Sequence, residues 1–168
     1  MTDQSALPER VAIVGAGVIG AAWAARWLLR GVDVAVTDPS ATAPKVVAHV
    51  VDNARHAWTR MGIEPEREGA LTFVDSIDAA VRDADIVQEN VPEILELKKT
   101  ILGQIEDSVD AATLIASSTS GLKPSVLQAD LRCPERLVVG HPFNPVYLLP
   151  MVEVVGGEST SSESISRA

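Results

Sequence analysis

One histidine and one glutamate form a candidate pair for moving a proton. His141 ends an apolar run and lies between Gly140 and Pro142, which restrict its direction. A neutral imidazole at such a position can accept a proton near neutral pH. Glu153 follows within the apolar run 151–155, where a carboxylate is costly unless it has a partner. Pairing would fix the imidazole tautomer and stabilise the imidazolium, so the sequence predicts a general base and its partner.

Short polar side chains accompany this pair. Ser120 ends the run Ser-Ser-Thr-Ser before Gly121, and Asn144 follows His141 by three residues. Both would add hydrogen-bonding groups beside the base. Alternatives stay open for each of these features. The serine-rich run could be a plain turn or a helix N-cap, His141 a core histidine bonded to a carbonyl, and Glu153 a polar residue on an edge strand.

A glycine-rich run near the N-terminus could hold a pyrophosphate. It has the pattern G-x-G-x-x-G and consists of Gly15, Ala16, Gly17, Val18, Ile19 and Gly20. The pattern follows a predicted strand and opens a predicted helix, which is the context that the motif requires. Gly15 permits a tight turn, Gly17 a close approach to the pyrophosphate, and Gly20 close packing of helix on strand. All of these residues except Ala16 are predicted cofactor-binding residues.

Asp38 predicts which dinucleotide binds. It ends the second predicted strand, 23 residues after Gly15, where an acid accepts hydrogen bonds from the adenosine ribose. A carboxylate there repels a 2′-phosphate, and Pro39 and Ser40 follow it instead of an arginine. The sequence therefore predicts NAD rather than NADP. A glycine-rich turn with a capping aspartate is the alternative.

The elements that must position these residues alternate along the chain. Short apolar runs predict strands at residues 11–14, 32–36, 71–74, 86–87, 113–116, 137–140 and 152–155. Helical patterns cover residues 18–30, 41–61, 76–81, 94–105 and 124–128. Gly31 is placed to cap the first helix, and Ser76 the third. The alternation predicts an α/β fold of the Rossmann type, a doubly wound and mostly parallel sheet with helices on both faces.

The composition describes one globular domain and excludes several partners. The 168 residues fit one domain. A net charge of −9 argues against binding to nucleic acid or to an anionic membrane surface. Cys133 is the single cysteine, which excludes an internal disulfide and a multi-cysteine metal site and fits a reducing cytoplasm. His49 and His56 would lie about 10 Å apart along a helix and could not share a metal ion.

The apolar stretch from Val11 to Ala25 also permits a different interpretation. It follows Arg10 and has the small residues of a signal-peptide cleavage site. Three glycines within the stretch and Arg26 after it favour a buried strand followed by a buried helix instead.

Taken in order, the motifs resemble one enzyme family. The glycine run, Asp38, the Ser-Thr-Ser-Gly segment, the His-Pro-Phe-Asn-Pro segment and Glu153 are similar to the nucleotide-binding half of L-3-hydroxyacyl-CoA dehydrogenases, over about residues 10–157. The intervals of 21 residues from Ser120 to His141 and of 12 residues from His141 to Glu153 match those of the family. Segments 117–122 and 141–157 look most like those of its carnitine-oxidising members.

The resemblance implies a role for each site residue. His141 would be the general base and Glu153 its partner. Ser120 and Asn144 would touch the substrate oxygen. The implied reaction is the NAD-dependent oxidation of the 3-hydroxyl of carnitine to a ketone.

Glu93 and Lys98 complete the resemblance on the cofactor side. They follow the fourth predicted strand and resemble the acid and the lysine that flank the nicotinamide in the family. An ordinary solvated helix with Glu–Lys pairs is the alternative for these two residues.

The resemblance also implies a second domain. In the family, a helical domain follows the nucleotide domain, closes the substrate site and builds a homodimer. We therefore expect a tail at residues 1–9, an NAD-binding domain at 10–157 and, at 158–168, the start of a connection to such a domain. By itself the chain should bind NAD but turn over carnitine poorly or not at all. Two other functions stay open: a hydroxyacyl-CoA dehydrogenase, which would need basic residues for the CoA phosphates, and a non-catalytic NAD-sensing or scaffold module.

Overall fold

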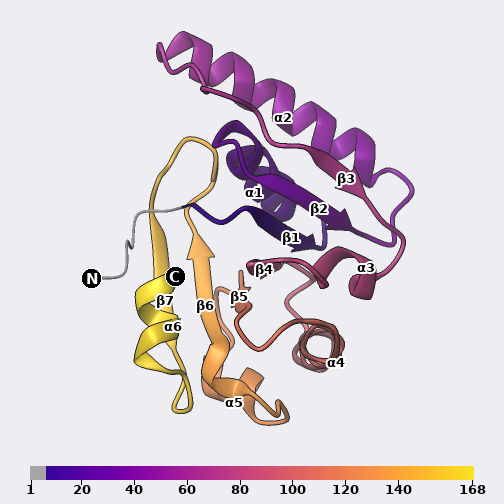
Figure 1. Ribbon diagram of the computed structural model, residues 1–168, viewed down its shortest axis with the longest axis vertical. Helices are drawn as coiled ribbons and strands as arrows, with labels where there is room; N and C mark the ends of the chain where they lie inside the picture. The colour runs from indigo at the N-terminus through magenta and orange to yellow at the C-terminus, as the bar shows by residue number, and fades with distance from the viewer. Residues whose placement is uncertain (1–6) are drawn as a thin grey trace.

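Seven strands form a single sheet at the centre of the molecule (Figure 1). The computed structural model describes residues 7–168. The strands are β1 (Arg10–Val14), β2 (Asp33–Thr37), β3 (Leu71–Phe73), β4 (Ile86–Glu89), β5 (Leu114–Ser117), β6 (Leu137–Pro142) and β7 (Val152–Gly156). Their order across the sheet is β3-β2-β1-β4-β5-β6-β7. All neighbours pair in parallel except β6 and β7, which are antiparallel. The predicted doubly wound, mostly parallel fold is confirmed.

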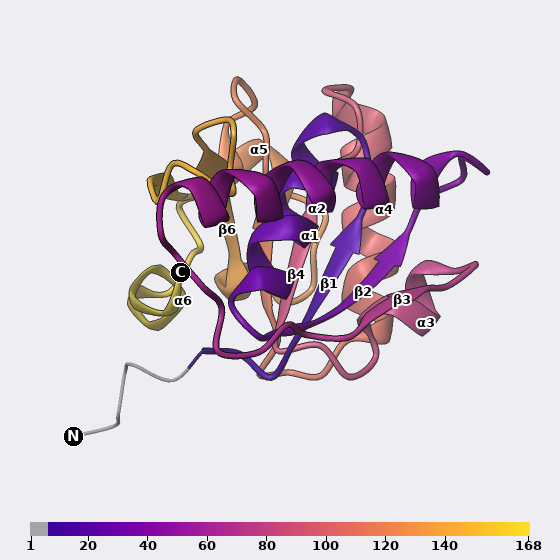
Figure 2. The ribbon, with the colours of Figure 1, turned by 90° about the horizontal axis from the view of Figure 1, so that it is seen from above.

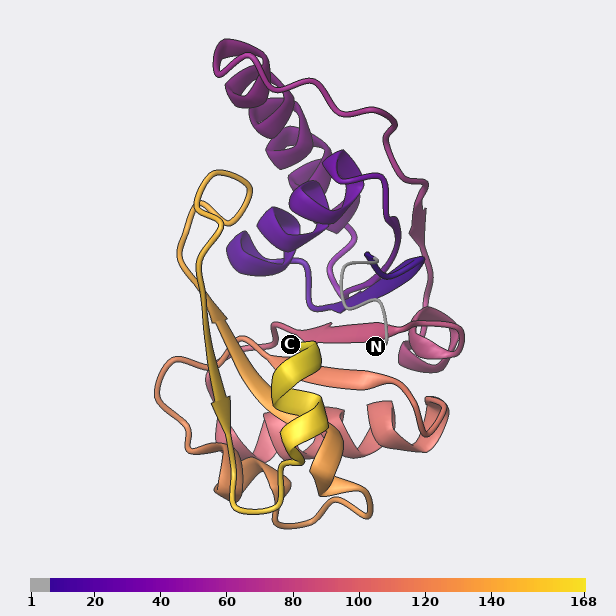
Figure 3. The same ribbon diagram turned by 60° about the vertical axis from the view of Figure 1, so that its left-hand side comes forward.

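Helices cover both faces of this sheet. They are α1 (Val18–Leu29), α2 (Ala43–Arg60), α3 (Ile77–Val81), α4 (Leu95–Ser108), α5 (Pro124–Gln128) and α6 (Ser162–Arg167), with a 3₁₀ turn at Pro134–Arg136. Figure 3 shows the indigo and purple helices α1 and α2 on one side of the strands and α4 on the other. From above, α2 lies across α1 (Figure 2), and the two helices pack on each other.

The residue pattern of β1 explains the two layers. Side chains alternate between the faces of a strand, so Val11 and Ile13 pack in the core under α1 and α2. Ala12 and Val14 pack in the core formed with α3, α4 and α5. All four are at most 3% exposed. A continuous apolar run is therefore what a strand covered on both faces requires.

Local signals set several helix ends as predicted. Gly31 follows α1 with a φ of 83°, a conformation that glycine adopts most readily. Ser76 caps α3, and its Oγ accepts a hydrogen bond from the Ala79 amide at 3.2 Å. The stretch from Val11 to Ala25 forms the predicted buried strand and helix. Within residues 7–168, no helix has the length and apolarity that crossing a bilayer requires.

Some predicted ends differ from the structure. The helix predicted at 94–105 extends to Ser108, and the 3₁₀ turn at Pro134–Arg136 was not predicted. Of the predicted tail at 1–9, residues 1–6 lie outside the described residues. The predicted division after residue 157 stays a prediction, although α6 packs on β6 and β7.

The strand order leaves a crevice at one edge of the sheet. β1 lies between β2 and β4, and the chain leaves β1 toward β2 but leaves β4 toward β5. The loops after β1 and β4 therefore diverge. In open α/β sheets, ligands bind at this point, beside the carboxyl ends of the strands.

Candidate active site

The antiparallel pairing of β6 and β7 places His141 directly opposite Glu153. The Nδ1 atom of His141 lies 2.8 Å from Oε2 of Glu153. Because a carboxylate only accepts hydrogen bonds, Nδ1 carries the hydrogen and the lone pair of Nε2 is left for another partner. The structure thus brings together the two residues that the sequence predicts as base and partner.

The reason given for this pairing from the sequence is wrong in one respect. Glu153 does not lie in a buried run, because β7 is an edge strand with mostly exposed residues. The side chains are 32% exposed for His141 and 59% exposed for Glu153. The register of the two strands, rather than the cost of burying a charge, therefore brings the carboxylate to the imidazole.

Ser120 lies near this pair, and Asn144 lies in the loop after it. Ser120, His141 and Glu153 line one cavity of about 210 Å³. Asn144 is not among the residues that line it. The ring of Phe143 lies 6.3 Å from the His141 ring, between centroids. The structure therefore supports Ser120 as a neighbour of the base more directly than Asn144.

The glycine turn has the geometry of a phosphate cradle. Gly15 has a φ of 89°. A Cβ atom on Gly20 would lie 1.9 Å from the carbonyl oxygen of Gly15, so a side chain there is excluded. A Cβ atom on Gly17 would meet nothing within 4 Å. The turn is thus packed at its ends and open at Gly17, where a pyrophosphate would lie.

The first turn of α1 offers free backbone amides to this open side. Gly17 is the N-cap and provides no side-chain hydrogen bond. Unpaired amides and the helix dipole favour an anion at such an end. Val18 is 70% exposed there, whereas the side chain of Ile19 packs against the core. These two predicted residues can therefore contribute through their backbone.

Asp38 joins the glycine turn to the neighbouring cavity. Its Oδ2 accepts a hydrogen bond from the Ala16 amide at 2.6 Å, and its Oδ1 accepts one from the Ser40 amide at 2.8 Å. Each carboxylate oxygen retains a lone pair for a ribose hydroxyl. Asp38 and Gly17 line a mostly apolar cavity of about 530 Å³ that reaches Ile101 on α4. Its size and lining fit the adenosine half of a dinucleotide.

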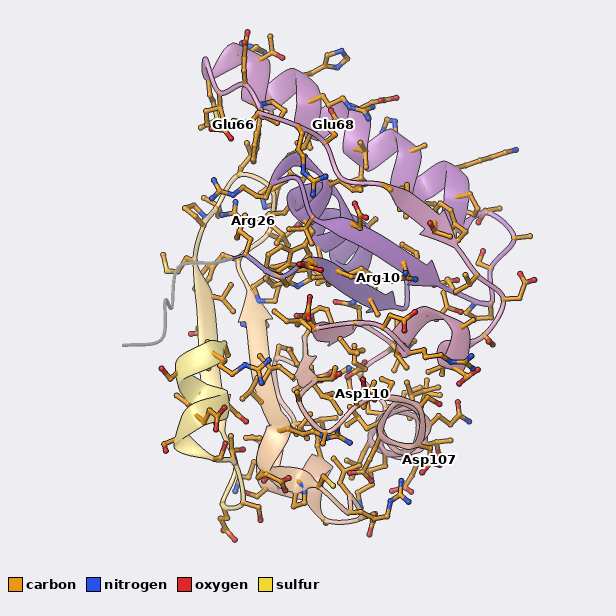
Figure 4. All side chains as sticks on the ribbon, in the orientation of Figure 1. Arg10, Arg26, Glu66, Glu68, Asp107 and Asp110 are labelled. Atoms are coloured by element: carbon orange, nitrogen blue, oxygen red, sulfur yellow. The ribbon has the colours of Figure 1, made fainter. Side chains whose placement is uncertain are left out.

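More carboxylates surround the open side of this region. Asp75, Asp78 and Asp107 line an adjoining cavity together with Asp38. Asp107 belongs to the last turn of α4 and is labelled in Figure 4. Asp78 and Asp107 are paired with Arg82 and Arg132, so the net negative charge here comes from Asp38 and Asp75. This charge opposes an extra phosphate on the ribose, which agrees with NAD as the dinucleotide.

Glu93 and Lys98 lie near the end of β4, but their surroundings differ from a solvated helix. The Lys98 side chain is 1% exposed and its Nζ lies 2.8 Å from the fully buried carboxylate of Glu89. The alternative of a solvated pair is therefore wrong for Lys98. Glu89 was not predicted as a site residue. The polar run Gln88-Glu89-Asn90 at the end of an apolar strand was the signal that could have identified it.

Glu93 accepts hydrogen bonds from the serine-rich loop. Burial raises the pKa of Glu93, but hydrogen bonds from Thr119 and Gly121, the charge of Lys98 and the Ser120 amide outweigh it and lower this pKa. Glu93 is therefore a carboxylate at neutral pH. It connects the segment after β4 to the loop that carries Ser120.

Comparisons with known proteins agree with this geometry. Residues 10–168 match the family described as "3-hydroxyacyl-CoA dehydrogenase, NAD binding domain". The chain is 49% identical over 161 residues to an L-carnitine dehydrogenase of Oceanobacillus iheyensis, and the aligned region covers 95% of this chain and 52% of that protein. It is 51% identical over 163 residues to an L-carnitine dehydrogenase of Mesorhizobium japonicum, and the aligned region covers 95% of this chain and 44% of that protein.

A solved structure shows the same fold. The crystal structure of 3-hydroxybutyryl-CoA dehydrogenase from Escherichia coli matches with a TM-score of 0.86 and 29% identity, over 96% of this chain and 35% of that chain. The chain spans about half the length of the two curated relatives.

Proposed function

This chain belongs to the family of 3-hydroxyacyl-CoA dehydrogenase NAD-binding domains, and we propose that it is the cofactor-binding half of an enzyme that oxidises L-carnitine to 3-dehydrocarnitine. NAD is the cofactor of this family, as the sequence predicts. The observation that carries the proposed chemistry is the 2.8 Å contact between His141 and Glu153 at the ligand-binding edge of the sheet. The choice of carnitine rests on the two relatives that bear this name.

The proposed mechanism follows from the free lone pair of His141. Its Nε2 accepts the proton of the 3-hydroxyl while Nδ1 stays bonded to Glu153. Glu153 holds the ring in this tautomer and stabilises the imidazolium that forms. Ser120 and Asn144 would hold the substrate oxygen. The acceptor for the hydride on the same carbon is supplied by NAD when it is bound.

The cradle residues would fix the cofactor in place. Gly17 and the first amides of α1 would hold the pyrophosphate. Asp38 would accept hydrogen bonds from the ribose. Glu93 and Lys98 would lie on the nicotinamide side.

A second candidate is a 3-hydroxyacyl-CoA dehydrogenase, which the similarity to the Escherichia coli structure favours. The proton transfer would be the same, and only the substrate would differ. The net charge of −9 counts against a ligand as anionic as CoA. A non-catalytic NAD-binding module gives no reason for a carboxylate-bound imidazole at this edge.

The complete enzyme, assayed for NADH formation, distinguishes these candidates. We expect kcat/KM for L-carnitine to exceed that for 3-hydroxybutyryl-CoA by at least about 100-fold, because a site built for one polar group rejects a substrate that lacks it. A preference for 3-hydroxybutyryl-CoA would contradict the proposed substrate. Turnover of neither compound would favour the binding module.

The chain spans only half of its relatives, and this leads to a further expectation. We expect residues 1–168 alone to bind NAD but to oxidise carnitine at least about 100-fold more slowly than the complete enzyme, because part of the substrate site would be missing. Isothermal titration with NAD and a rate assay on the same sample check this. Equal rates for the two proteins would contradict it.

The resemblance also leads us to propose a cytoplasmic homodimer for the complete enzyme.

A further inference from the structure

Glu89, the last residue of β4, has a buried carboxylate that the proposed mechanism does not use. None of its surface is exposed. Its Oε1 accepts hydrogen bonds from the Val91 amide at 2.6 Å and from Lys98 Nζ at 2.8 Å. Its Oε2 accepts one from Ser117 Oγ at 2.5 Å. A buried charge is stable only with such partners, and these donors come from three different segments.

Lys98, in the first turn of α4, connects this carboxylate to Glu93. Its Nζ lies 2.8 Å from Oε1 of Glu89 and 3.6 Å from Oε2 of Glu93. It also donates a hydrogen bond to the Val91 carbonyl at 3.0 Å. Lys98 therefore lies between two carboxylates, and its position relative to one depends on its attraction to the other.

Glu93 in turn fixes the backbone that carries Ser120. Its Oε1 accepts the amide hydrogens of Ser120 and Gly121, each at 3.0 Å, and the hydroxyl hydrogen of Thr119 at 2.5 Å. The Thr119 amide donates a hydrogen bond to Ser117 Oγ at 3.4 Å, and this closes the set of contacts. We name this set the Glu89 network, consisting of Glu89, Lys98, Glu93, Thr119 and Ser117.

We propose that Glu89 is a positioning residue: it holds Lys98 in place so that Glu93 keeps the backbone of Ser120 fixed beside His141. The inference rests on the proposed function, which assigns Ser120 to the substrate oxygen and His141 to its proton. Both residues line the same cavity. Without the charge of Glu89, Lys98 would pair with Glu93 alone and draw this carboxylate away from the Ser120 amide. Small displacements of a positioning contact are enough to slow a reaction.

The test removes the charge and keeps the shape. Glu89→Gln is made in the complete enzyme, and Glu106→Gln is the matched control. Glu106 is also a buried glutamate that accepts backbone hydrogen bonds, from Arg132 and Cys133 near the other end of α4. The hydrogen bonds and the ion pair of its carboxylate all go to Arg132 and Cys133, outside the Glu89 network.

Amide hydrogen exchange of the peptide 117–122, followed by mass spectrometry, reports on the Glu93 contacts without turnover. We expect Glu89→Gln to speed this exchange about tenfold. The reason is that the charge-assisted hydrogen bonds from the Ser120 and Gly121 amides to Glu93 should weaken.

We expect kcat to fall about 10- to 100-fold. The Kd of NAD should rise by less than about tenfold, because Glu93 and Lys98 shift on the nicotinamide side while the contacts to the pyrophosphate and the ribose stay in place. Glu106→Gln should leave kcat and the Kd of NAD unchanged. Any faster exchange that it causes should be no greater in the peptide 117–122 than elsewhere in the sheet, because its loss of stability is not confined to this loop. Unchanged exchange in Glu89→Gln, or a lower kcat without faster exchange, would overturn the proposal.

A double variant keeps the test valid if Glu89→Gln folds poorly. Glu89→Gln with Lys98→Met removes both buried charges, which proteins tolerate better than the loss of one. If Glu89 acts through Lys98, the double variant has the same kcat and the same exchange as Lys98→Met alone. If the fold-losses in kcat of Glu89→Gln and Lys98→Met multiply in the double variant, the proposal is overturned. Failure of the wild-type enzyme to oxidise carnitine would refute the proposed substrate only, because the exchange measurement involves no substrate.

Discussion

Asp38 contributes to the cofactor site in two ways. Its carboxylate holds the glycine turn through the Ala16 amide, and it lines the cavity next to this turn. Its neighbour Asp75 adds negative charge on the open side, whereas Asp78 and Asp107 are paired with arginines. Charge around the ribose position therefore does not depend on Asp38 alone.

Asp38→Ala should weaken the binding of NAD without creating a site for NADP. We expect the Kd of NAD to rise at least about tenfold, because hydrogen bonds to a charged group contribute about 1.5–3 kcal/mol. NADP should not bind more tightly than NAD, since Asp75 still opposes its phosphate and, within residues 7–168, no lysine or arginine lines this cavity. Calorimetric titration of both dinucleotides measures this, with Ser40→Ala as the control. An NADP preference in Asp38→Ala would contradict the electrostatic argument.

At the scale of residues, the sequence predicts local motifs better than networks. The glycine run, Asp38 and the pair His141 and Glu153 can be proposed from the sequence because each has a specific neighbourhood in the chain. The polar run around Glu89 marks this position, but not the partners of its carboxylate. One of them, Ser117, is 28 residues away, and no local pattern identifies such a contact. The burial of Glu89 depends on how β4, β5 and α4 pack.

At the scale of elements, the start of α1 separates the packing of a helix from the binding of an anion. Gly20 lies against the backbone of Gly15, whereas Gly17 faces open space. The two glycines therefore have different physical reasons to lack a side chain. Substitution by alanine distinguishes them.

Gly20→Ala should destabilise the fold, and Gly17→Ala should not. The methyl group added by Gly20→Ala would overlap the Gly15 carbonyl oxygen, so we expect a loss of about 1–3 kcal/mol in the free energy of unfolding. For Gly17→Ala we expect a change of less than about 1 kcal/mol, but NAD binding at least about tenfold weaker because the methyl group occupies the pyrophosphate position. Urea unfolding and NAD titration of both variants provide the measurements. Normal NAD affinity in Gly17→Ala would place the pyrophosphate elsewhere.

Glu106 connects α4 to the turn after α5. Its carboxylate accepts the amide hydrogens of Arg132 at 2.9 Å and Cys133 at 2.7 Å. Burial raises the pKa of Glu106, but these two hydrogen bonds and the Arg132 guanidinium outweigh it and lower the pKa below its ordinary value of 4.5. A lowered pKa means that the folded state favours the carboxylate. The stabilisation is present above pH 4.5 and is lost as the pH falls through the lowered pKa.

Glu106→Gln should therefore be destabilising in a pH-dependent way. At pH 7 we expect a loss of about 1–3 kcal/mol, since two buried amides lose a charged acceptor. As the pH falls below 4.5, the wild-type carboxyl takes up a proton and the difference between the two proteins should shrink. Urea unfolding curves across this pH range measure it. A difference that grows toward acid pH would contradict the assignment.

The sequence predicts the positions of the strands at the centre and at the edge of the sheet, but not their exposure. β7, predicted at 152–155, forms at Val152–Gly156, whereas the central β4, predicted at 86–87, extends to Glu89. β7 has an apolar run like those of the central strands but lies at the edge, where its residues are largely exposed. Apolar composition alone does not distinguish these cases, because exposure depends on what packs against the strand.

At the scale of the whole molecule, parallel strands bring distant segments to one edge. The glycine turn follows β1, the Glu89 network begins at the last residues of β4 and β5, and His141 lies near the end of β6. The antiparallel β7 begins at the same edge, so Glu153 joins them. The alternation of strands and helices in the sequence predicts this assembly, but the cavities between the segments depend on side-chain packing and could not be predicted.

The most direct test of the account is the kcat for L-carnitine of the complete enzyme with His141→Ala, measured together with the Kd of NAD. If His141 is the general base, kcat falls about 100- to 10,000-fold, and the Kd of NAD changes by less than about threefold because the cradle is intact. A variant that retains kcat within about tenfold of the wild type would contradict the assignment of the proton to His141.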